Sequence, residues 1–205
     1  MNEFTRLRRD FFLQDTKSVA KELLGKYLVR ETPNVSMVGK IIEVEAYLGP
    51  SDKASHAYNY KKTERTKIMY MAPGTIYIYF IYGLYYCLNV ITEPEGIPCA
   101  VLIRQLYPIE GIELMVENRN IKIGKNFQNL TDGPGKLCMA LNITKDKFNG
   151  KNCCSINSKL FFSEGEKINN KTIVANKRIG IKYAEEDKDR LLRFTLKTKN
   201  LSFLN

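Results

Sequence analysis

The strongest constraint on the fold is the tyrosine-rich stretch TIYIYFIYGLYYCLNVIT at residues 75–92, in which two apolar segments flank Tyr82-Gly83. Segments rich in β-branched and aromatic residues that meet at a short glycine-containing turn are typical of an antiparallel hairpin. We therefore predict strands over residues 75–81 and 84–91. Because side chains alternate at period two, Tyr77 and Tyr79 share one face, and Tyr82 has the opposite parity near the turn.

The rest of the chain alternates between short strand-like and helix-like segments. Strands are predicted over residues 26–30, 40–48, 98–106, 160–162, 172–176, 178–183 and 191–197, and helices over 15–25, 109–119 and 136–142. Strands outnumber helices, most connections are short, and neither a repeat nor a linker divides the chain. This pattern favours a single α+β domain over residues 1–205 with a mixed, largely antiparallel sheet.

Composition narrows the classes of partner. The net charge of +10, from 32 basic and 22 acidic residues, points to nucleic acid or an anionic membrane surface, but an abundance of Lys, Asn and Ile would produce the same surplus by coding bias. The apolar stretch 76–91 is too polar for a membrane span, and the charged N-terminus does not resemble a signal peptide. A cytoplasmic protein is therefore expected.

Cysteine and histidine usage gives no support for a metal centre. The five cysteines have no CxxC spacing, and most lie in apolar runs, which indicates reduced and buried thiols. With one histidine, a His-rich metal site cannot be built. We expect no metal.

A carboxylate pair marks the strand at residues 40–48. Glu43, Glu45 and Tyr47 share one face of this strand, and for an arbitrary strand a solvated acidic face is the more common explanation. A carboxylate beside an aromatic pocket is also what an enzyme needs to activate a water molecule. Parity does not distinguish Glu43 from Glu45.

Three further residues could carry chemistry. His56 by itself is more often a loop or capping residue than a catalytic one. Arg104 ends an apolar strand, and a guanidinium in that environment needs an acidic partner, for which a glutamate of the site is the natural candidate. A large aromatic such as Tyr82 at an exposed hairpin tip suits a wedge between stacked bases.

Five segments in order resemble the alkyladenine (3-methyladenine) DNA glycosylase family: EVEAYLGPSDKASHAY, MYMAPGTIYIYFIYGLYYCLNV, AVLIRQLYPIEG, DGPGKLCMALNI and RIGIKYA. The resemblance implies a curved sheet with flanking helices and a DNA-wedging hairpin. It also implies a monofunctional base-excision repair enzyme that flips damaged purines out of double-stranded DNA and hydrolyses their N-glycosidic bond. Substrates of the 3-methyladenine, hypoxanthine and ethenoadenine class are implied. A monomer without metal or organic cofactor is expected, nucleoid-associated if the source is bacterial.

The resemblance also assigns roles to residues. It places the general base at Glu45, with Arg104 helping to hold the nucleophilic water. It places Tyr82 in the minor groove, where it fills the vacated stack. The pocket for the flipped base is implied to include Tyr47, His56, Tyr79, Asn89 and Leu102, and the groove-lining neighbours are Met69 and Tyr85.

Basic residues near these segments are candidate phosphate contacts. Lys61, Lys62, Arg65 and Lys67 lie in the loop between the two site-bearing segments. Lys136 follows DGPG at a predicted helix start, where backbone N–H groups attract anions, although an ordinary capped turn is the slightly favoured interpretation.

Three other functions remain open at this stage. A catalytically silent nucleic-acid-binding module explains the charge and the tyrosines but not Glu45 with Arg104. A small-molecule nucleoside hydrolase explains the glutamate but not Tyr82. A bifunctional glycosylase-lyase needs a Schiff-base lysine, and no lysine is placed within the site-bearing strands.

Overall fold

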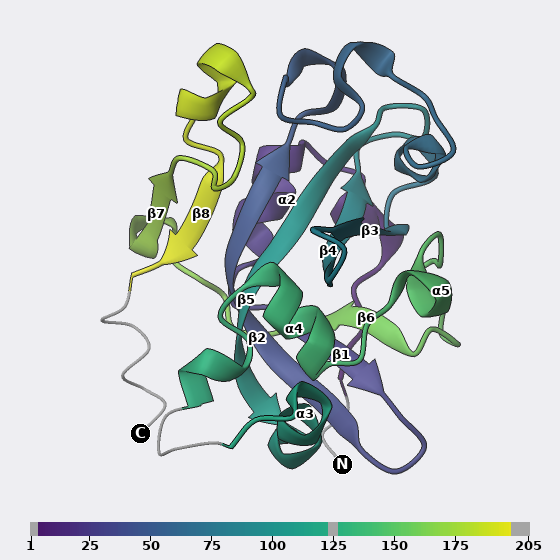
Figure 1. The fold of residues 1–205 in the computed structure, drawn as a ribbon, viewed down its shortest axis with the longest axis vertical. Coiled ribbons are helices and arrows are strands. Elements are labelled where there is room, and N and C mark those ends of the chain that lie inside the picture. The colour runs from purple at the N-terminus through teal and green to yellow at the C-terminus, as the bar shows by residue number, and fades with distance from the viewer. Residues whose placement is uncertain (1–3, 123–126, 198–205) are drawn as a thin grey trace.

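Two long strands form the centre of the fold. In the computed structural model, which describes residues 4–122 and 127–197, β2 (Ser36–Tyr47) and β5 (Cys99–Glu110) pair antiparallel along most of their length (Figure 1). Both strands are rich in β-branched and apolar residues and largely buried, as expected for central strands. They place Glu45 opposite Leu102 in the register.

The remaining strands extend this pair in both directions. Strand order is β3-β4-β5-β2-β1-β6, and β7-β8 joins through the pairing of β8 with β2. All pairings among the described strands are antiparallel, so the largely antiparallel α+β prediction is confirmed. The outer strands are β1 (Tyr27–Glu31), β3 (Ile76–Ile81), β4 (Tyr85–Thr92), β6 (Leu160–Ser163), β7 (Ile173–Asn176) and β8 (Arg193–Leu196).

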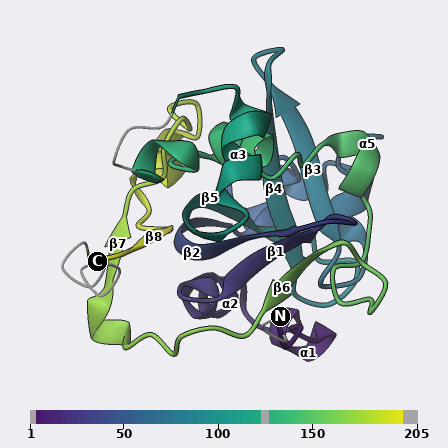
Figure 2. The same cartoon turned by 90° about the horizontal axis from the view of Figure 1, so that it is seen from below.

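Helices cover both sides of the sheet. α2 (Thr16–Leu23) begins at the N-cap Asp15, whose carboxylate accepts from the backbone N–H of Ser18 at 2.9 Å, and it buries Val19, Ala20 and Leu23. It lies on one side of the curled sheet and α3 (Ile112–Arg119) on the other (Figure 2). The other helices are α1 (Arg9–Phe12), α4 (Pro134–Ala140), which packs against β4 and β5, and α5 (Lys145–Phe148).

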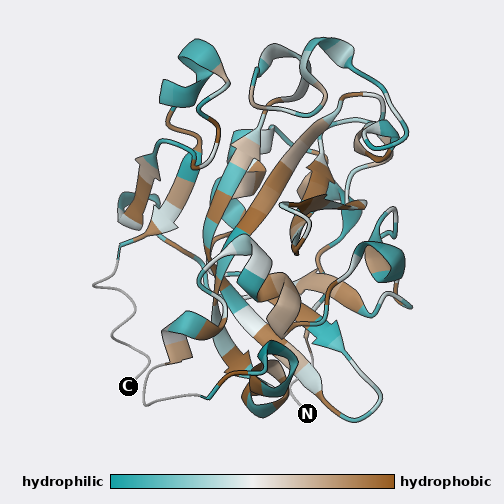
Figure 3. Ribbon diagram, in the orientation of Figure 1, coloured by the Kyte–Doolittle hydropathy of each residue, from teal (hydrophilic) through white to brown (hydrophobic). Residues whose placement is uncertain are grey.

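One large apolar core lies between these layers. Hydrophobic residues follow β3 and β5, whereas hydrophilic residues gather on the peripheral turns (Figure 3). Four cysteines are buried, Cys154 is partly buried, and all five are free thiols. Among the described residues, no helix is both long and apolar enough to cross a membrane.

Two bulges interrupt the pairing of β2 and β5 beside the carboxylate pair. The register passes from Ile41↔Leu106 to Glu43↔Gln105 and then to Val44↔Ile103, so Ile42 and Arg104 have no partner in it. A bulge re-aims the side chains around it and is over-represented next to active sites. Arg104 therefore lies at an irregularity that simple alternation does not predict.

The prediction of a strand at residues 178–183 is wrong. This segment is irregular backbone between β7 and the 3₁₀ turn Glu185–Asp189, and Gly180 has a φ of 80°. The backbone N–H of Ile179 donates to the Glu45 carboxylate, and the Arg178 side chain is bound to Asp52. The Ile179 N–H thus bonds to a side chain and not to a neighbouring strand.

Candidate active site

A cavity of about 440 Å³ opens where β2, β3, β4 and β5 meet the irregular segment 179–183. This volume falls within the usual range for small-molecule sites. Ten residues proposed from sequence line it: Glu45, Tyr47, His56, Arg65, Met69, Tyr79, Tyr82, Asn89, Leu102 and Arg104. Elements far apart in the sequence therefore bring these side chains to one cavity.

Glu45 is a fully buried carboxylate that lines this cavity. Its Oε2 accepts from the Tyr47 hydroxyl at 2.8 Å, and its Oε1 accepts from the Ile179 N–H at 2.9 Å. Arg104 Nη1 lies 3.3 Å from the same Oε1. A carboxylate offers about four lone-pair sites, so these three donors leave one lone pair that can accept from a further donor such as water.

Burial dominates the protonation of Glu45. Desolvation raises the pKa of this carboxyl above its ordinary value, and the Arg104 charge, the Ile179 N–H, Tyr47 and the Arg178 charge oppose that shift. A carboxylate whose pKa is moved toward neutral pH, while it remains ionised, is a stronger base.

Arg104 bridges the two carboxylates of β2. Its Nε donates to Glu43 Oε1 at 2.9 Å, and Arg193 Nη1 reaches the same oxygen at 3.1 Å. The expected acidic partner of Arg104 is thus a pair of glutamates. Glu45 lines the cavity, whereas Glu43 is not among the lining residues.

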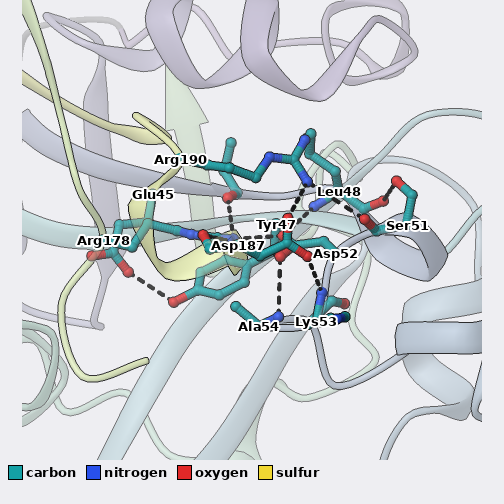
Figure 4. A network of polar contacts seen from close by, with 12 residues as sticks. Glu45, Tyr47, Leu48, Ser51, Asp52, Lys53, Ala54, Arg178, Asp187 and Arg190 are labelled. Atoms are coloured by element: carbon teal, nitrogen blue, oxygen red, sulfur yellow. Dashed lines mark hydrogen bonds and ion pairs between the residues drawn. The ribbon is translucent and has the colours of Figure 1, made fainter. Parts of the chain in front are cut away.

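Arg178 packs against the face of the Tyr47 ring, and its guanidinium carbon lies 4.8 Å from the ring centroid. Arg178 in turn makes two contacts with Asp52, Nη1 to Oδ2 at 2.5 Å and Nη2 to Oδ1 at 2.7 Å, and donates to Ala46 O at 3.0 Å (Figure 4). Tyr47 therefore contacts Glu45 through its hydroxyl and Arg178 through its ring face.

His56 and two tyrosines of β3 form another part of the lining. His56 Nδ1 lies 2.9 Å from the Tyr77 hydroxyl, and the His56 and Tyr79 rings meet edge to face with centroids 4.6 Å apart. Arg65 Nη2 lies 3.1 Å from His56 Nε2. Because arginine only donates, Nε2 accepts and Nδ1 carries the proton. Burial and the Arg65 charge lower the pKa of His56 to about 4, so the ring is neutral at pH 7.

Three apolar or amide residues fill out the lining. Asn89 is buried, and its amide donates to Tyr77 O at 3.1 Å. Leu102 is also buried. Met69, expected at the DNA groove, is only 2% exposed and packs with Ala57 and Tyr77, so its position is a pocket wall rather than a surface.

The β3–β4 turn presents an aromatic side chain to solvent. Tyr82 is 83% exposed and has a φ of 52°, and it is followed by Gly83 at 67°. Both residues have the left-handed conformation that tight strand connections require. Tyr85 lies outside the cavity lining and packs closely against Gly135, where an added Cβ would meet its ring atoms.

The basic residues of the 61–67 segment differ in their surroundings. All four are exposed, but Arg65 reaches into the cavity lining, Lys62 lies over the Tyr70 ring, and Lys67 pairs with Glu64. Lys136 pairs with Asp132 at 2.7 Å, so its charge already has an acidic partner. The N-cap of α4 is Gly133, and no side chain caps this helix.

Several site residues escaped the sequence reasoning. Tyr77 shares the parity of Tyr79, which was the available signal. Asp52 lies beyond the strand predicted over residues 40–48 and received no role from its sequence. The irregular backbone at 178–183 was predicted as a strand, so no role was assigned to Arg178, Ile179 and Tyr183. No three His, Cys, Asp or Glu side chains in residues 4–122 and 127–197 lie where they could hold a metal ion.

Comparisons with known proteins identify the family. The sequence model of the family described as methylpurine-DNA glycosylase (MPG) matches residues 10–200. The chain belongs to this family. It is therefore a DNA glycosylase, a hydrolase of N-glycosyl bonds, and the resemblance found in the sequence is confirmed.

Curated bacterial relatives of this glycosylase match over nearly their whole length. A protein of Clostridium novyi (strain NT) named "Putative 3-methyladenine DNA glycosylase" is 51% identical over 200 residues, which cover 94% of this chain and 95% of the relative. Proteins of the same name from Clostridium tetani (strain Massachusetts / E88) and Clostridium perfringens (strain 13 / Type A) are 52% and 50% identical. These alignments cover 92% and 94% of this chain, and 94% and 96% of the relatives.

Proposed function

We propose that this glycosylase flips alkylated or deaminated purines, of the 3-methyladenine, hypoxanthine and ethenoadenine class, out of double-stranded DNA and removes them with a water activated by Glu45. The observation that carries the proposal is the position of that carboxylate. It is buried, lines a cavity of about 440 Å³, and is held by Tyr47, Arg104 and the Ile179 N–H.

The aromatic lining suits a flat, electron-poor base. Tyr47, Tyr79 and His56 supply ring surfaces, and stacking of a base on an aromatic side chain is worth about 1–3 kcal/mol. A methylated purine such as 3-methyladenine is cationic in DNA, and the negative faces of tyrosine rings attract cations. Selectivity for damaged bases then needs few base-specific hydrogen bonds.

Tyr82 supports the extrusion step. Unstacking a base costs a few kcal/mol, less for a damaged or mispaired one. The Tyr82 side chain is exposed on the β3–β4 turn and borders the cavity, which supports a role in filling the gap left in the duplex. Lys61, Lys62 and Tyr85 are proposed as nearby DNA contacts, with phosphates for the two lysines.

For a cationic lesion such as 3-methyladenine, the chemistry requires one carboxylate. The bond from C1′ to the purine nitrogen breaks toward an oxocarbenium-like sugar, and the water oxygen adds to C1′ while its proton passes to Glu45. Enzymes that cleave O-glycosidic bonds use two carboxylates, one of which protonates the leaving group. A cationic methylpurine leaves as a neutral base and needs no such acid, whereas a neutral lesion such as hypoxanthine or ethenoadenine must also take up a proton as its bond to C1′ breaks.

One experiment tests this function. A labelled duplex with a single hypoxanthine or ethenoadenine is incubated with the protein and EDTA, and the sample is divided for base analysis and for strand analysis. We expect free base, with strand breaks only after alkali or heat. Breaks without alkali would indicate a lyase, binding without release a silent module, and release from free nucleosides alone a small-molecule hydrolase.

We further propose that the enzyme is a cytoplasmic monomer and that residues 1–205 form a single domain. A monomer elutes in size-exclusion chromatography at the size expected for 23.6 kDa. Elution at twice that mass would contradict the monomer.

A further inference from the structure

Arg65 is one of the residues that line the cavity, although its segment is on the surface. Its guanidinium carbon is 5.1 Å from the centroid of the Tyr79 ring, within the distance of a cation–π contact. Its Nη2 is 3.1 Å from His56 Nε2. The cation thus contacts two of the three rings proposed to receive the flipped base.

This position conflicts with a bound purine. While the guanidinium covers Tyr79, that part of the ring is not open to a stacked base. A cationic methylpurine beside the guanidinium would also be repelled, because like charges in a partly buried site are screened less than in water. Arg65 must therefore move before a base stacks on Tyr79.

Arg65 also interacts with the Tyr77 hydroxyl, but no carboxylate among the described residues pairs with it. Within the part of the chain that the structure describes, Lys67 of the same segment pairs with Glu64, whereas Arg65 forms no ion pair with a carboxylate. Its neighbours Lys61 and Lys62 are exposed and basic. A DNA phosphate would offer the charge partner that the free protein lacks, and arginine suits phosphate through its planar fork.

We propose that Arg65 is a gate on the base-binding cavity: it covers Tyr79 and His56 in the free enzyme and moves to a DNA phosphate when the damaged purine enters. The proposal rests on the function proposed above. It assigns Arg65 two opposite effects, since it opposes entry of a base and favours binding of the DNA backbone. A simple phosphate contact has only the second effect.

Replacing Arg65 by methionine separates these effects, and Lys62→Met is the matched control from the same segment. The first measurement is binding of free ethenoadenine base, followed by its fluorescence. We expect Arg65→Met to bind the base about two- to fivefold more tightly than the unmodified enzyme, because no cation–π contact is broken. Lys62→Met should bind the base as the unmodified enzyme does.

The second measurement is binding to a duplex with one ethenoadenine, with every protein carrying Glu45→Gln so that the base stays attached. Arg65→Met should bind this duplex more weakly, and the slope of log K against log salt should fall by about 1. Arg65→Lys keeps the charge and should lose less duplex affinity.

His56 provides a readout that does not depend on affinity, since it is the only histidine in the chain. We expect free ethenoadenine to move the His56 Nε2 nitrogen resonance of the unmodified enzyme toward its position in Arg65→Met. The gate is overturned if Arg65→Met binds free base no better than the unmodified enzyme, or if the base leaves that resonance unchanged. An enzyme that releases no base from damaged duplex would instead refute the proposed function, and the gate with it.

Discussion

Asp52 and Arg178 form a two-point ion pair in which neither side chain has exposed surface. The pair joins the turn after β2 to the irregular segment before β8. Arg178 also lies over the Tyr47 ring and donates to Ala46 O, and its neighbour Ile179 donates to Glu45. The contacts of Glu45 with segment 178–183 therefore depend on a charge pair that has no contact with solvent.

Breaking this pair should destabilise the protein strongly. Asp52→Asn leaves the guanidinium buried without its charge partner, which typically costs about 3–5 kcal/mol in the free energy of unfolding. Urea denaturation measures this loss. Glu64→Gln, which disrupts the exposed pair with Lys67, should leave the urea midpoint nearly unchanged. Equal effects of the two substitutions would show that segment 178–183 is held by other contacts.

Glu45→Gln should keep lesion binding and lose base release. Loss of a general base lowers rates by about 10²–10⁴-fold, and the amide keeps nearly the same shape. Single-turnover release from ethenoadenine duplex, with binding measured in parallel, checks this. Glu43→Gln is the matched control and should retain more activity. If Glu43→Gln is the inactive variant instead, the assignment of the base is wrong.

Arg104→Met should move the acidic limb of the pH–rate profile to higher pH. The Arg104 charge lowers the pKa of Glu45 against the larger effect of burial, so its removal leaves that pKa higher still. Activity requires the ionised carboxylate and is lost as pH falls through this pKa. Single-turnover rates measured across pH give the position of this acidic limb. A limb at the same pH in both proteins would show that Arg104 does not influence the pKa of Glu45.

Tyr82→Ser should weaken base flipping without affecting stability. The side chain is 83% exposed, so the folded protein loses little packing, whereas the duplex loses the aromatic that fills its gap. Fluorescence of ethenoadenine in a duplex bound by Glu45→Gln reports flipping. Ile156→Ser, at a residue that is also 83% exposed but outside the cavity lining, is the control. A similar loss in both variants would argue against a wedge.

His56 should make stability depend on pH between about 6.5 and 4. Its pKa is lowered to about 4 in the folded protein, so in this window the unfolded chain binds more protons and stability falls as pH falls. One pKa unit corresponds to about 1.4 kcal/mol, which sets the loss by pH 4 at roughly 2–3 kcal/mol. Unfolding of the unmodified protein and of His56→Gln across this range measures the difference. Parallel curves would contradict the lowered pKa.

Local sequence pattern was enough to determine much of the sheet. Alternation in residues 40–48 and 75–91 correctly predicted strands there, and Tyr82-Gly83 correctly marked the turn between the paired strands β3 and β4. Asp15 was also correctly predicted as the N-cap of α2, because an N-cap side chain bonds to a backbone N–H only a few residues away. These features depend on residues within a few positions of one another.

Tertiary structure decided what this pattern left open. Glu43 and Glu45 have the same parity, and Arg104 contacts both. The Ile179 N–H, the Tyr47 hydroxyl and the place in the cavity lining distinguish Glu45. The bulge at Arg104 and the irregular backbone at 178–183 arise from contacts with residues far away in the chain. Such partners compete with local hydrogen bonding, so alternation could place the glutamates on a strand but could not determine which of them meets the cavity.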